Sequence, residues 1–370
     1  NPKKNLQFLT FFVNTIKAVR EYADLLRAGI ASASNDYRLG ANEAPPAIIS
    51  VFIGSQLYNV LMELEKVSEG KLTPDEKYDL KLNVVGKIPE ILLDNTDRNR
   101  TSPFAFTGNK FEIRAVGSSA NCAETMTIMN SIMAKQLKVF KSEVDGLIEK
   151  EGLKKDEAIF NVLREYIKES KNIMFEGDGY SEDWAKEAQK RGLSNLKTTP
   201  EALKRELDKK FVAMYEDLGI FTHREIEARN EIKLEKYSSV VDIEARVLAD
   251  IARNHIIPSA LKYQNRLIEN VKGLKEIYGE KDFRPLAKEQ MSLIERISQS
   301  VHQIKVGVDE LLEAKDKAKS IEDSQKQAEA FCNNVKPLFP NIREASDTLE
   351  MMVDDELWPM TKYRELLFTR

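Results

Sequence analysis

The sequence is poor in cysteine, with Cys122 and Cys332 as the two cysteines among 370 residues. Two cysteines without a CxxC spacing are too few for a disulfide framework, and they favour a reducing compartment such as the cytoplasm. Glycine and proline are also scarce, at 16 and 12 residues. This scarcity argues against a turn-rich all-β fold and allows long uninterrupted helices.

No charge of one sign predominates, since 56 Lys and Arg residues accompany 60 Asp and Glu residues, for a net charge of −4. The basic excess typical of nucleic-acid binding is missing, so we expect no nucleic-acid partner. Long hydrophobic runs are missing too: the stretch 6–13 is interrupted by Gln7 and Thr10 and is shorter than the ~20 residues that span a bilayer. We therefore expect no membrane association, in a globular chain long enough for two domains.

Several motifs of common enzyme classes are absent. The three histidines, His223, His255 and His302, have no partners at metal-ligand spacing, and packed or solvated side chains are the simpler interpretation. No glycine-rich dinucleotide motif follows a strand, and neither a Walker A motif nor a GxSxG motif occurs. These absences argue against classical dinucleotide-binding, P-loop and hydrolase functions.

Hydrophobic periodicity is helical over most of the chain. Apolar residues three and four apart from Leu9 to Leu26 predict an amphipathic helix, and similar stretches recur later, one of them with Pro258 as an expected kink. Because few turn signals separate the stretches beyond residue 240, we expect an antiparallel helical bundle there. Helices are predicted over 5–33, 56–67, 243–277, 286–319 and 347–368.

Two short segments have the pattern of strands. Residues 47–53 are apolar and β-branched, and residues 110–116 alternate between apolar and polar. The period of two places Glu112 and Arg114 on one face, about 7 Å apart along the strand. This pair suits a site for a hard cation and an anionic oxygen, but taken alone a surface pair on an edge strand is the simpler interpretation.

Two segments upstream of that strand combine arginine with polar residues. The segment 98–102, Arg-Asn-Arg-Thr-Ser, suits a phosphate-binding loop or a solvated turn, and the turn is the simpler interpretation. Arg38 and Glu43 flank a Gly-Ala-Asn loop that by itself is typical of an ordinary surface loop.

In combination, these segments resemble the second half of a glutamine synthetase catalytic domain. The family's R-L-x-x-x-E-A-P loop, R-N-R-[ST] segment and E-x-R strand correspond in order to residues 38–45, 98–102 and 111–114. The insertion over 55–97 and the segments 101–110 and 175–181 are similar to the large type III enzymes. The resemblance covers essentially the whole chain.

The resemblance implies an α+β, mostly helical fold. Residues 1–246 would form the C-terminal part of the β-barrel catalytic domain, with insertions at about 55–97 and 140–195, and residues 247–370 would form a helical bundle extension. It further implies an ATP-dependent ligase that makes glutamine from glutamate and ammonia through γ-glutamyl phosphate, with Mg²⁺ or Mn²⁺. A cytoplasmic homo-oligomer, a double hexameric ring in the family, is implied as well.

Carried over from the family pattern, Glu112 would be a metal ligand and Arg114 would hold the substrate carboxylate or the phosphoryl oxygens. Arg100 would bind the nucleotide and neutralise charge on the γ-phosphate during transfer. Two departures from the common pattern, Ala105 in place of an arginine and Lys110 in place of another, weaken the nucleotide contacts expected here. We still expect Lys110 to contact the nucleotide, although the family has an arginine at this position.

Two further roles follow from the R-L…E-A-P loop. Arg38 would bind the α-carboxylate of glutamate, a task suited to a planar donor with two prongs. Glu43 would lie on a flap that excludes water from the acyl phosphate and would help to bind and deprotonate ammonium. The loop is one residue shorter than in the short enzymes, so the placement of Glu43 is open.

The family's upstream strands carry further metal-binding glutamates, a histidine and most of the ATP site, and none of these precedes Asn1. We therefore expect a fragment that has no synthetase activity by itself. Two alternatives stay open: a γ-glutamyl ligase of the same fold that uses another amine, and a non-catalytic helical scaffold. The presence of Arg38, Glu43, Arg100, Glu112 and Arg114 argues against the scaffold.

Overall fold

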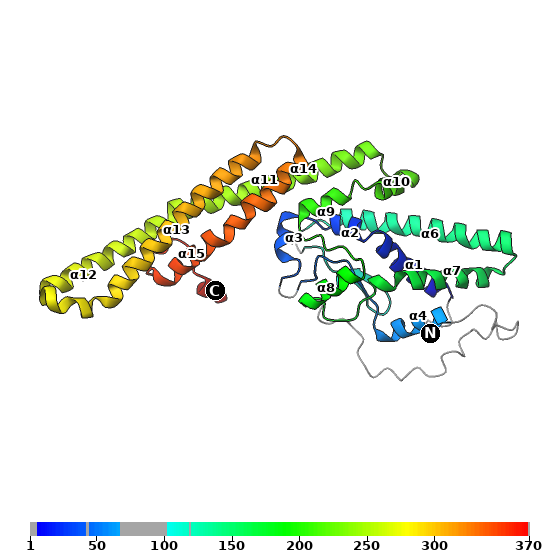
Figure 1. Ribbon diagram of the computed structural model, residues 1–370, viewed down its shortest axis with the longest axis horizontal. Helices are drawn as coiled ribbons and strands as arrows, with labels where there is room; N and C mark the ends of the chain where they lie inside the picture. Colours follow the sequence, from blue (N-terminus) through cyan, green and yellow to red (C-terminus); the bar gives the residue numbers. More distant parts are fainter. Residues whose placement is uncertain (1–5, 42–43, 67–101, 118–119, 369–370) are drawn as a thin grey trace. The chain divides into compact units, whose positions relative to one another are not determined.

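The computed structural model describes residues 6–41, 44–66, 102–117 and 120–368 (Figure 1). The chain is mostly helical with a small sheet, as expected, and it divides into two compact units, residues 1–230 and 231–370. The division falls within helix α11 (His223–Ile251), and so does the domain boundary expected after residue 246. That domain boundary stays a prediction.

Unit 1 begins with three helices: α1 (Leu6–Glu21), α2 (Ala23–Ala28) and α3 (Ala33–Arg38). The helix predicted over 5–33 is thus present as two helices, with Tyr22 between them. The Tyr22 N–H still donates to the Ala18 carbonyl at 3.1 Å, although its own backbone leaves the helical region. The apolar stripe that predicted α1 is buried, as its spacing requires.

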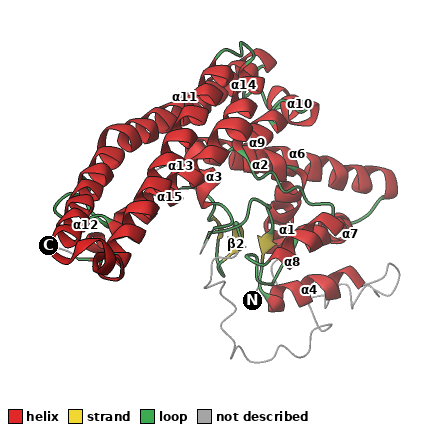
Figure 2. Ribbon diagram, turned by 60° about the vertical axis from the view of Figure 1, so that its left-hand side comes forward, coloured by secondary structure: helices red, strands yellow, loops and turns green. Residues whose placement is uncertain are grey.

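Three further helices complete the core around α1. Helix α4 (Ser55–Lys66) confirms the helix predicted over 56–67; it packs against α7 (Lys155–Glu169), and α1 packs against both α7 and α6 (Ala123–Glu151) (Figure 2). Helix α6 ends at Gly152, whose φ of +68° is the left-handed conformation that glycine adopts without strain.

A three-stranded sheet lies against α1. Its order is β1 (Val51–Phe52), β2 (Phe104–Phe106) and β3 (Phe111–Ile113), with β1 parallel to β2 and β2 antiparallel to β3. Both predicted strands are present but shorter than expected, and β2 had not been predicted. An aromatic cluster joins the sheet to α1, with Phe12 stacked on Phe111 at 5.3 Å between ring centroids.

The rest of unit 1 consists of short helices joined by loops. These helices are the 3₁₀ turn η3 (Ser170–Ile173), α8 (Glu182–Lys190), α9 (Thr199–Arg205), α10 (Lys209–Asp217) and the start of α11. Met174 forms an isolated parallel bridge to Val51 and so borders the sheet on the β1 side.

Unit 2 is built from longer helices, α12 (Ile257–Leu286), α13 (Lys288–Lys319) and α15 (Phe339–Met352), with α12 packed along α13 and α13 along α15. A π-helical turn, η4 (Ala252–Ile256), separates α11 from α12, so the irregularity expected at Pro258 begins just before it. Pro258 itself lies in the first turn of α12, directly after the π-helical turn. Shorter elements complete the unit: α14 (Ser324–Ala330), η5 (Phe331–Val335), η6 (Lys336–Leu338) and η7 (Tyr363–Leu367).

The helix predicted over 347–368 is wrong. Helix α15 begins earlier, at Phe339, and ends at Met352, after which Val353 is extended. The apolar periodicity continues beyond Met352 although the helix does not. Pro359, which disfavours the helical region at Trp358, would interrupt a helix only further along.

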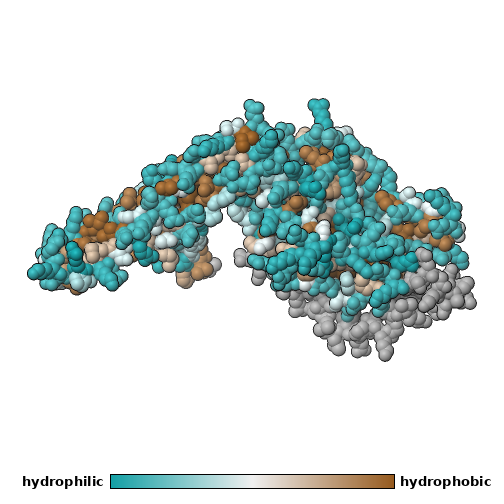
Figure 3. Space-filling model, viewed as in Figure 1, coloured by the Kyte–Doolittle hydropathy of each residue, from teal (hydrophilic) through white to brown (hydrophobic). Residues whose placement is uncertain are grey.

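Hydrophilic side chains predominate on the visible face of both units, with apolar side chains scattered among them (Figure 3). Among the described residues, no helix is both long enough and apolar enough to cross a membrane.

Candidate functional site

Strand β3 presents Lys110, Glu112 and Arg114 on one face. Glu112 is paired with Ala105 of β2, and the Arg114 N–H donates to the Pro103 carbonyl at 2.8 Å. One Glu112 carboxylate oxygen lies 3.1 Å from Lys110 Nζ and the other 3.4 Å from Arg114 Nε. The period of two thus places the three side chains together, as the alternating sequence predicted.

The two cations keep the Glu112 carboxylate charged. The hydrogen bond from Lys110 is the main cause that lowers the pKa of Glu112 below its ordinary value, and the charge of Arg114 acts in the same direction. Arg114 is the most buried of the three side chains and Lys110 the most exposed. The edge of β3 therefore carries one fixed negative charge between two positive ones.

Arg38 reaches the same strand from a distant part of the sequence. It is the last residue of α3, a helix capped by Ser32, whose Oγ accepts the Asn35 N–H at 3.2 Å. Arg38 Nη1 donates to the Ala115 carbonyl at 3.0 Å, and Nη2 donates to the Arg114 carbonyl at 3.3 Å. The structure thus brings Arg38 to the end of the strand that carries Glu112 and Arg114.

The orientation of Arg38 determines which of its donors are used. Nη1 donates both to Ala115 and to the Asn35 Oδ1, at 3.0 Å each, and Nη2 makes one bond. A guanidinium has five N–H groups, so one Nη2–H and the Nε–H have no hydrogen-bond partner among the described residues. In a guanidinium, the Nε–H and the neighbouring Nη2–H are parallel, the geometry that binds both oxygens of a carboxylate.

Helix α3 is also anchored on its other side. The Asp36 carboxylate accepts the Thr199 N–H at 3.0 Å and the Thr199 hydroxyl at 2.7 Å, at the start of α9. One Asp36 oxygen lies 3.7 Å from Nη2 of the buried Arg27, whose Nε donates to the Leu196 carbonyl at 2.8 Å. Burial lowers the pKa of the Arg27 guanidinium, and the charge of Asp36 opposes that shift.

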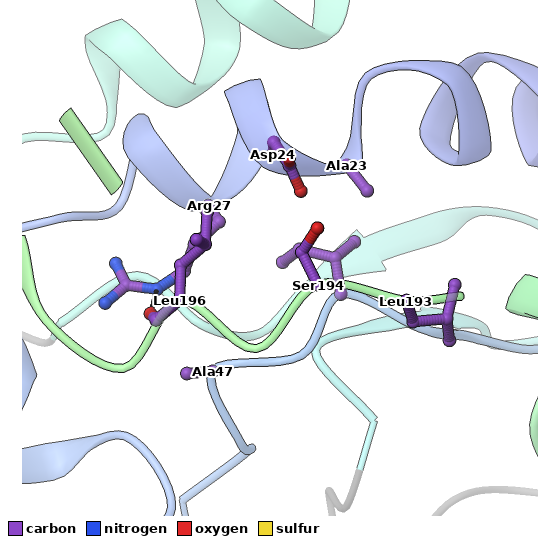
Figure 4. Close-up of a pocket in the computed structure, with 8 residues that line it drawn as sticks. Ala23, Asp24, Arg27, Ala47, Leu193, Ser194 and Leu196 are labelled. Carbon is purple, nitrogen blue, oxygen red and sulfur yellow. Dashed lines mark hydrogen bonds between the residues drawn. The ribbon is translucent and has the colours of Figure 1, made fainter. Parts of the chain in front are cut away.

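A small pocket lies beside this anchor, between α2 and the loop that precedes α9 (Figure 4). Arg27, Asp24 and Ser194 are among its lining residues, and the side chains of Arg27 and Leu196 lie next to each other in the close-up. Its volume of about 10 Å³ has room for about one water molecule, so it does not suit a nucleotide.

Comparison with known proteins identifies the relatives of this chain. Residues 158–275 match the family described as the glutamine synthetase C-terminal domain. The whole chain is 53% identical to a glutamine synthetase of Bacteroides fragilis, 36% identical to a type-3 glutamine synthetase of Dictyostelium discoideum and 32% identical to a glutamine synthetase of Butyrivibrio fibrisolvens. The chain is related to glutamine synthetases. The resemblance deduced from its motifs, including the type III features, is therefore confirmed.

The chain spans about half the length of these glutamine synthetases, 51%, 50% and 51% respectively. A half-length match agrees with the expectation that the chain represents part of a larger glutamine synthetase. The roles assigned to single residues by the family pattern are not decided by this similarity, and they stay predictions.

Two of the residues that the glutamine synthetase pattern selected, Glu43 and Arg100, lie outside the described residues. The structure therefore does not test the roles predicted for these two residues. Conversely, the motif pattern missed Asn35 and Asp36, which join α3 to β3 and to α9. In the sequence these two residues stand beside Ser32 and Ser34, a polar cluster typical of a helix end or a turn.

The described residues do not by themselves fit the metal ions that glutamine synthetases are expected to use. No group of three or more His, Cys, Asp or Glu residues suited to a metal occurs among them. Glu112 offers a single carboxylate, already paired with Lys110 and Arg114, whereas Mg²⁺ requires an octahedral set of oxygen ligands.

Proposed function

We propose that this chain is part of an ATP-dependent glutamate–ammonia ligase that makes glutamine through γ-glutamyl phosphate. The observation that supports this function best is the position of Arg38 on the end of β3, 77 residues away from its partner Ala115. In a relative of glutamine synthetases, that contact joins the predicted carboxylate-binding arginine to the strand with the predicted phosphoryl-binding and metal-binding side chains.

The reaction explains why cations are needed at this edge. The γ-carboxylate of glutamate is a poor electrophile, so ATP first transfers its γ-phosphoryl group to a carboxylate oxygen and leaves as ADP. Ammonia then attacks the acyl carbon, phosphate departs, and the nitrogen loses a proton. Glutamate and ATP both bring negative charge, which fixed cations must stabilise during transfer.

Each arginine of the described site has a place in this scheme. The parallel Nε–H and Nη2–H of Arg38 would bind the α-carboxylate of glutamate in two hydrogen bonds. Arg114, whose Nε lies 3.4 Å from Glu112, would hold the γ-carboxylate or the phosphoryl oxygens. Lys110, the most exposed of the three side chains on β3, would contact the nucleotide, together with Arg100.

The remaining roles depend on groups outside the described site. Glu112, the predicted ligand of Mg²⁺ or Mn²⁺, could hold such an ion only together with oxygen ligands from outside the described residues. Glu43 would exclude water and accept a proton from ammonium. The finer architecture, a β-barrel part over 1–246 and a helical bundle over 247–370 in a cytoplasmic double-ring homo-oligomer, belongs to this proposal as well.

The test is an assay of the full-length protein encoded by the gene. We expect phosphate release from ATP to require both glutamate and ammonium, with glutamine as the product, and we expect the 370-residue chain alone to show no turnover. Replacing ammonium with diamines and polyamines in parallel reactions tests the amine. Phosphate release without dependence on glutamate, or a strong preference for a larger amine, would contradict the proposal.

A further inference from the structure

Asn35 is a buried polar residue at the centre of the contact between α3 and β3. Its side chain is 3% exposed, and the amide makes three hydrogen bonds. Nδ2 donates to the Ile30 carbonyl at 2.7 Å and to the Ala115 carbonyl at 3.0 Å, while Oδ1 accepts from Arg38 Nη1 at 3.0 Å.

These bonds close a ring. The Ala115 carbonyl oxygen accepts from both Asn35 Nδ2 and Arg38 Nη1, and Arg38 Nη1 in turn donates to Asn35 Oδ1. An arginine side chain at the end of a six-residue helix would otherwise have several rotamers of similar energy. The ring fixes both the position of Nη1 and the plane of the guanidinium.

We propose that Asn35 is a positioning residue for Arg38, which holds the guanidinium so that its Nε–H and second Nη2–H face the substrate carboxylate. This inference rests on the proposed function. It makes Asn35 act through Arg38 without touching substrate, and it explains why a carboxamide is needed: the group must accept from a cation on one side and donate to two carbonyls on the other. An arginine fixed in advance loses less entropy when it binds its ligand.

A purely structural role for Asn35 is the competing explanation, because the same bonds also join α3 to β3. The two explanations differ in what happens when Arg38 is removed. A positioning residue loses its effect on glutamate binding in the absence of Arg38, whereas a structural residue keeps its effect.

The kinetic experiment uses the full-length protein and four forms: wild type, Asn35→Ala, Arg38→Ala and the double variant. We expect Asn35→Ala to raise KM for glutamate by about 10-fold, the size expected for one hydrogen bond to a charged group, with kcat and KM for ATP changed less. In the Arg38→Ala background the same substitution should change KM for glutamate by less than about twofold. An undiminished effect in that background would overturn the proposal.

Asn14→Ala is the matched control. Asn14 is also buried in unit 1, where Nδ2 donates to the Thr10 carbonyl at 2.8 Å and Oδ1 accepts from Gln136 at 3.0 Å. We expect this variant to lower the unfolding temperature about as much as Asn35→Ala and to leave KM for glutamate unchanged. Equal changes of KM in both variants would show a general loss of stability and would refute a positioning role. If Asn35→Ala does not fold, Asn35→Ser takes its place.

A second measurement separates this inference from the proposed function. Side-chain ¹⁵N NMR of the same protein reports whether the Arg38 guanidinium rotates slowly, as the ring of hydrogen bonds requires, or fast. Slow rotation in wild type and in Asn14→Ala, with fast rotation in Asn35→Ala, supports positioning even if the enzyme assay shows no glutamate dependence and the proposed function fails. Unchanged slow rotation in Asn35→Ala would contradict the positioning role even in an active glutamine-forming enzyme.

Discussion

The site edge of unit 1 and the long helices of unit 2 depend on different kinds of interaction. In unit 1, the short elements α3 and β3 are joined by hydrogen bonds from Asn35 and Arg38 to backbone carbonyls. In unit 2, α13 is held by apolar side chains that repeat along its length, with Ile304 among those that are completely buried. A single polar substitution should therefore disturb the first region strongly and specifically, whereas the second should respond in proportion to the apolar volume removed.

The largest effect is expected for Arg38→Ala. Loss of the two-pronged donor for the α-carboxylate should lower kcat/KM for glutamate by about 10²–10³-fold in the full-length protein, with a smaller change in KM for ATP. Steady-state kinetics with each substrate varied in turn measures this. Arg343→Ala is the control, because Arg343 makes an exposed pair with Asp347 in unit 2, at 2.9 Å, and should not affect kinetics. Similar losses for both variants would show that Arg38 has no special role.

Asp36→Ala should produce the largest loss of stability. The side chains of Asp36 and Arg27 are only 4% and 1% exposed, so removing the carboxylate takes the nearest negative charge from a buried cation, at a cost of about 3–5 kcal/mol. Asp347→Ala, which removes an exposed partner, should cost less than about 1 kcal/mol.

The two tryptophans allow the stability of each unit to be measured separately, because Trp184 lies in unit 1 and Trp358 in unit 2. Trp184 fluorescence in a Trp358→Phe background reports unit 1, and Trp358 fluorescence in a Trp184→Phe background reports unit 2. A loss for Asp36→Ala no larger than that for Asp347→Ala would contradict the anchoring role.

Ile304→Ala tests the other side of the comparison. Removing a completely buried side chain from α13 should lower the stability of unit 2 by about 2–4 kcal/mol, while Ile277→Ala, at a side chain that is 75% exposed, should have little effect. Denaturant unfolding followed by Trp358 measures both. If the Ile304 variant changed the Trp184 transition instead, the assignment of its effect to unit 2 would be wrong.

The same contrast explains which parts of the structure the sequence could predict. The helix expected over 286–319 is α13, Lys288–Lys319, because a long apolar period is a local signal that tertiary contacts only reinforce. The helix predicted over 347–368 was wrong because its apolar spacing continues beyond Met352, where the helix ends and Val353 is extended. Strand β2 went unnoticed because three residues are too few for a periodic pattern.

The sequence predicted the charged residues of the candidate site but not the residues that hold them in position. The motif pattern selected Arg38, Glu112 and Arg114, and the structure places all three near the end of β3. Asn35 carries no comparable signal, because its partners are backbone carbonyls and any residue supplies a carbonyl. Contacts of this kind appear only once the two segments are adjacent in space.

The smallest expected effect concerns the pH dependence of unit 1. Burial alone would raise the pKa of Glu21, but hydrogen bonds from Lys17 and Lys210 outweigh burial and lower that pKa to about 2. A carboxyl group with a lower pKa in the folded state stabilises the fold above its ordinary pKa of about 4.5, and this contribution is lost as the pH falls from about 5 to 2. Glu21→Gln should therefore make the unfolding temperature of unit 1 depend less on pH in that range, as followed by Trp184 fluorescence.

Glu313→Gln is the control in unit 2, where the exposed Lys317 lies four residues away on the same helix. We expect this substitution to leave the pH dependence of the unfolding temperature of unit 2 almost unchanged. An equal response of both variants would mean that the partly buried ion pairs of Glu21 and the exposed pair of Glu313 contribute alike, which would contradict this prediction.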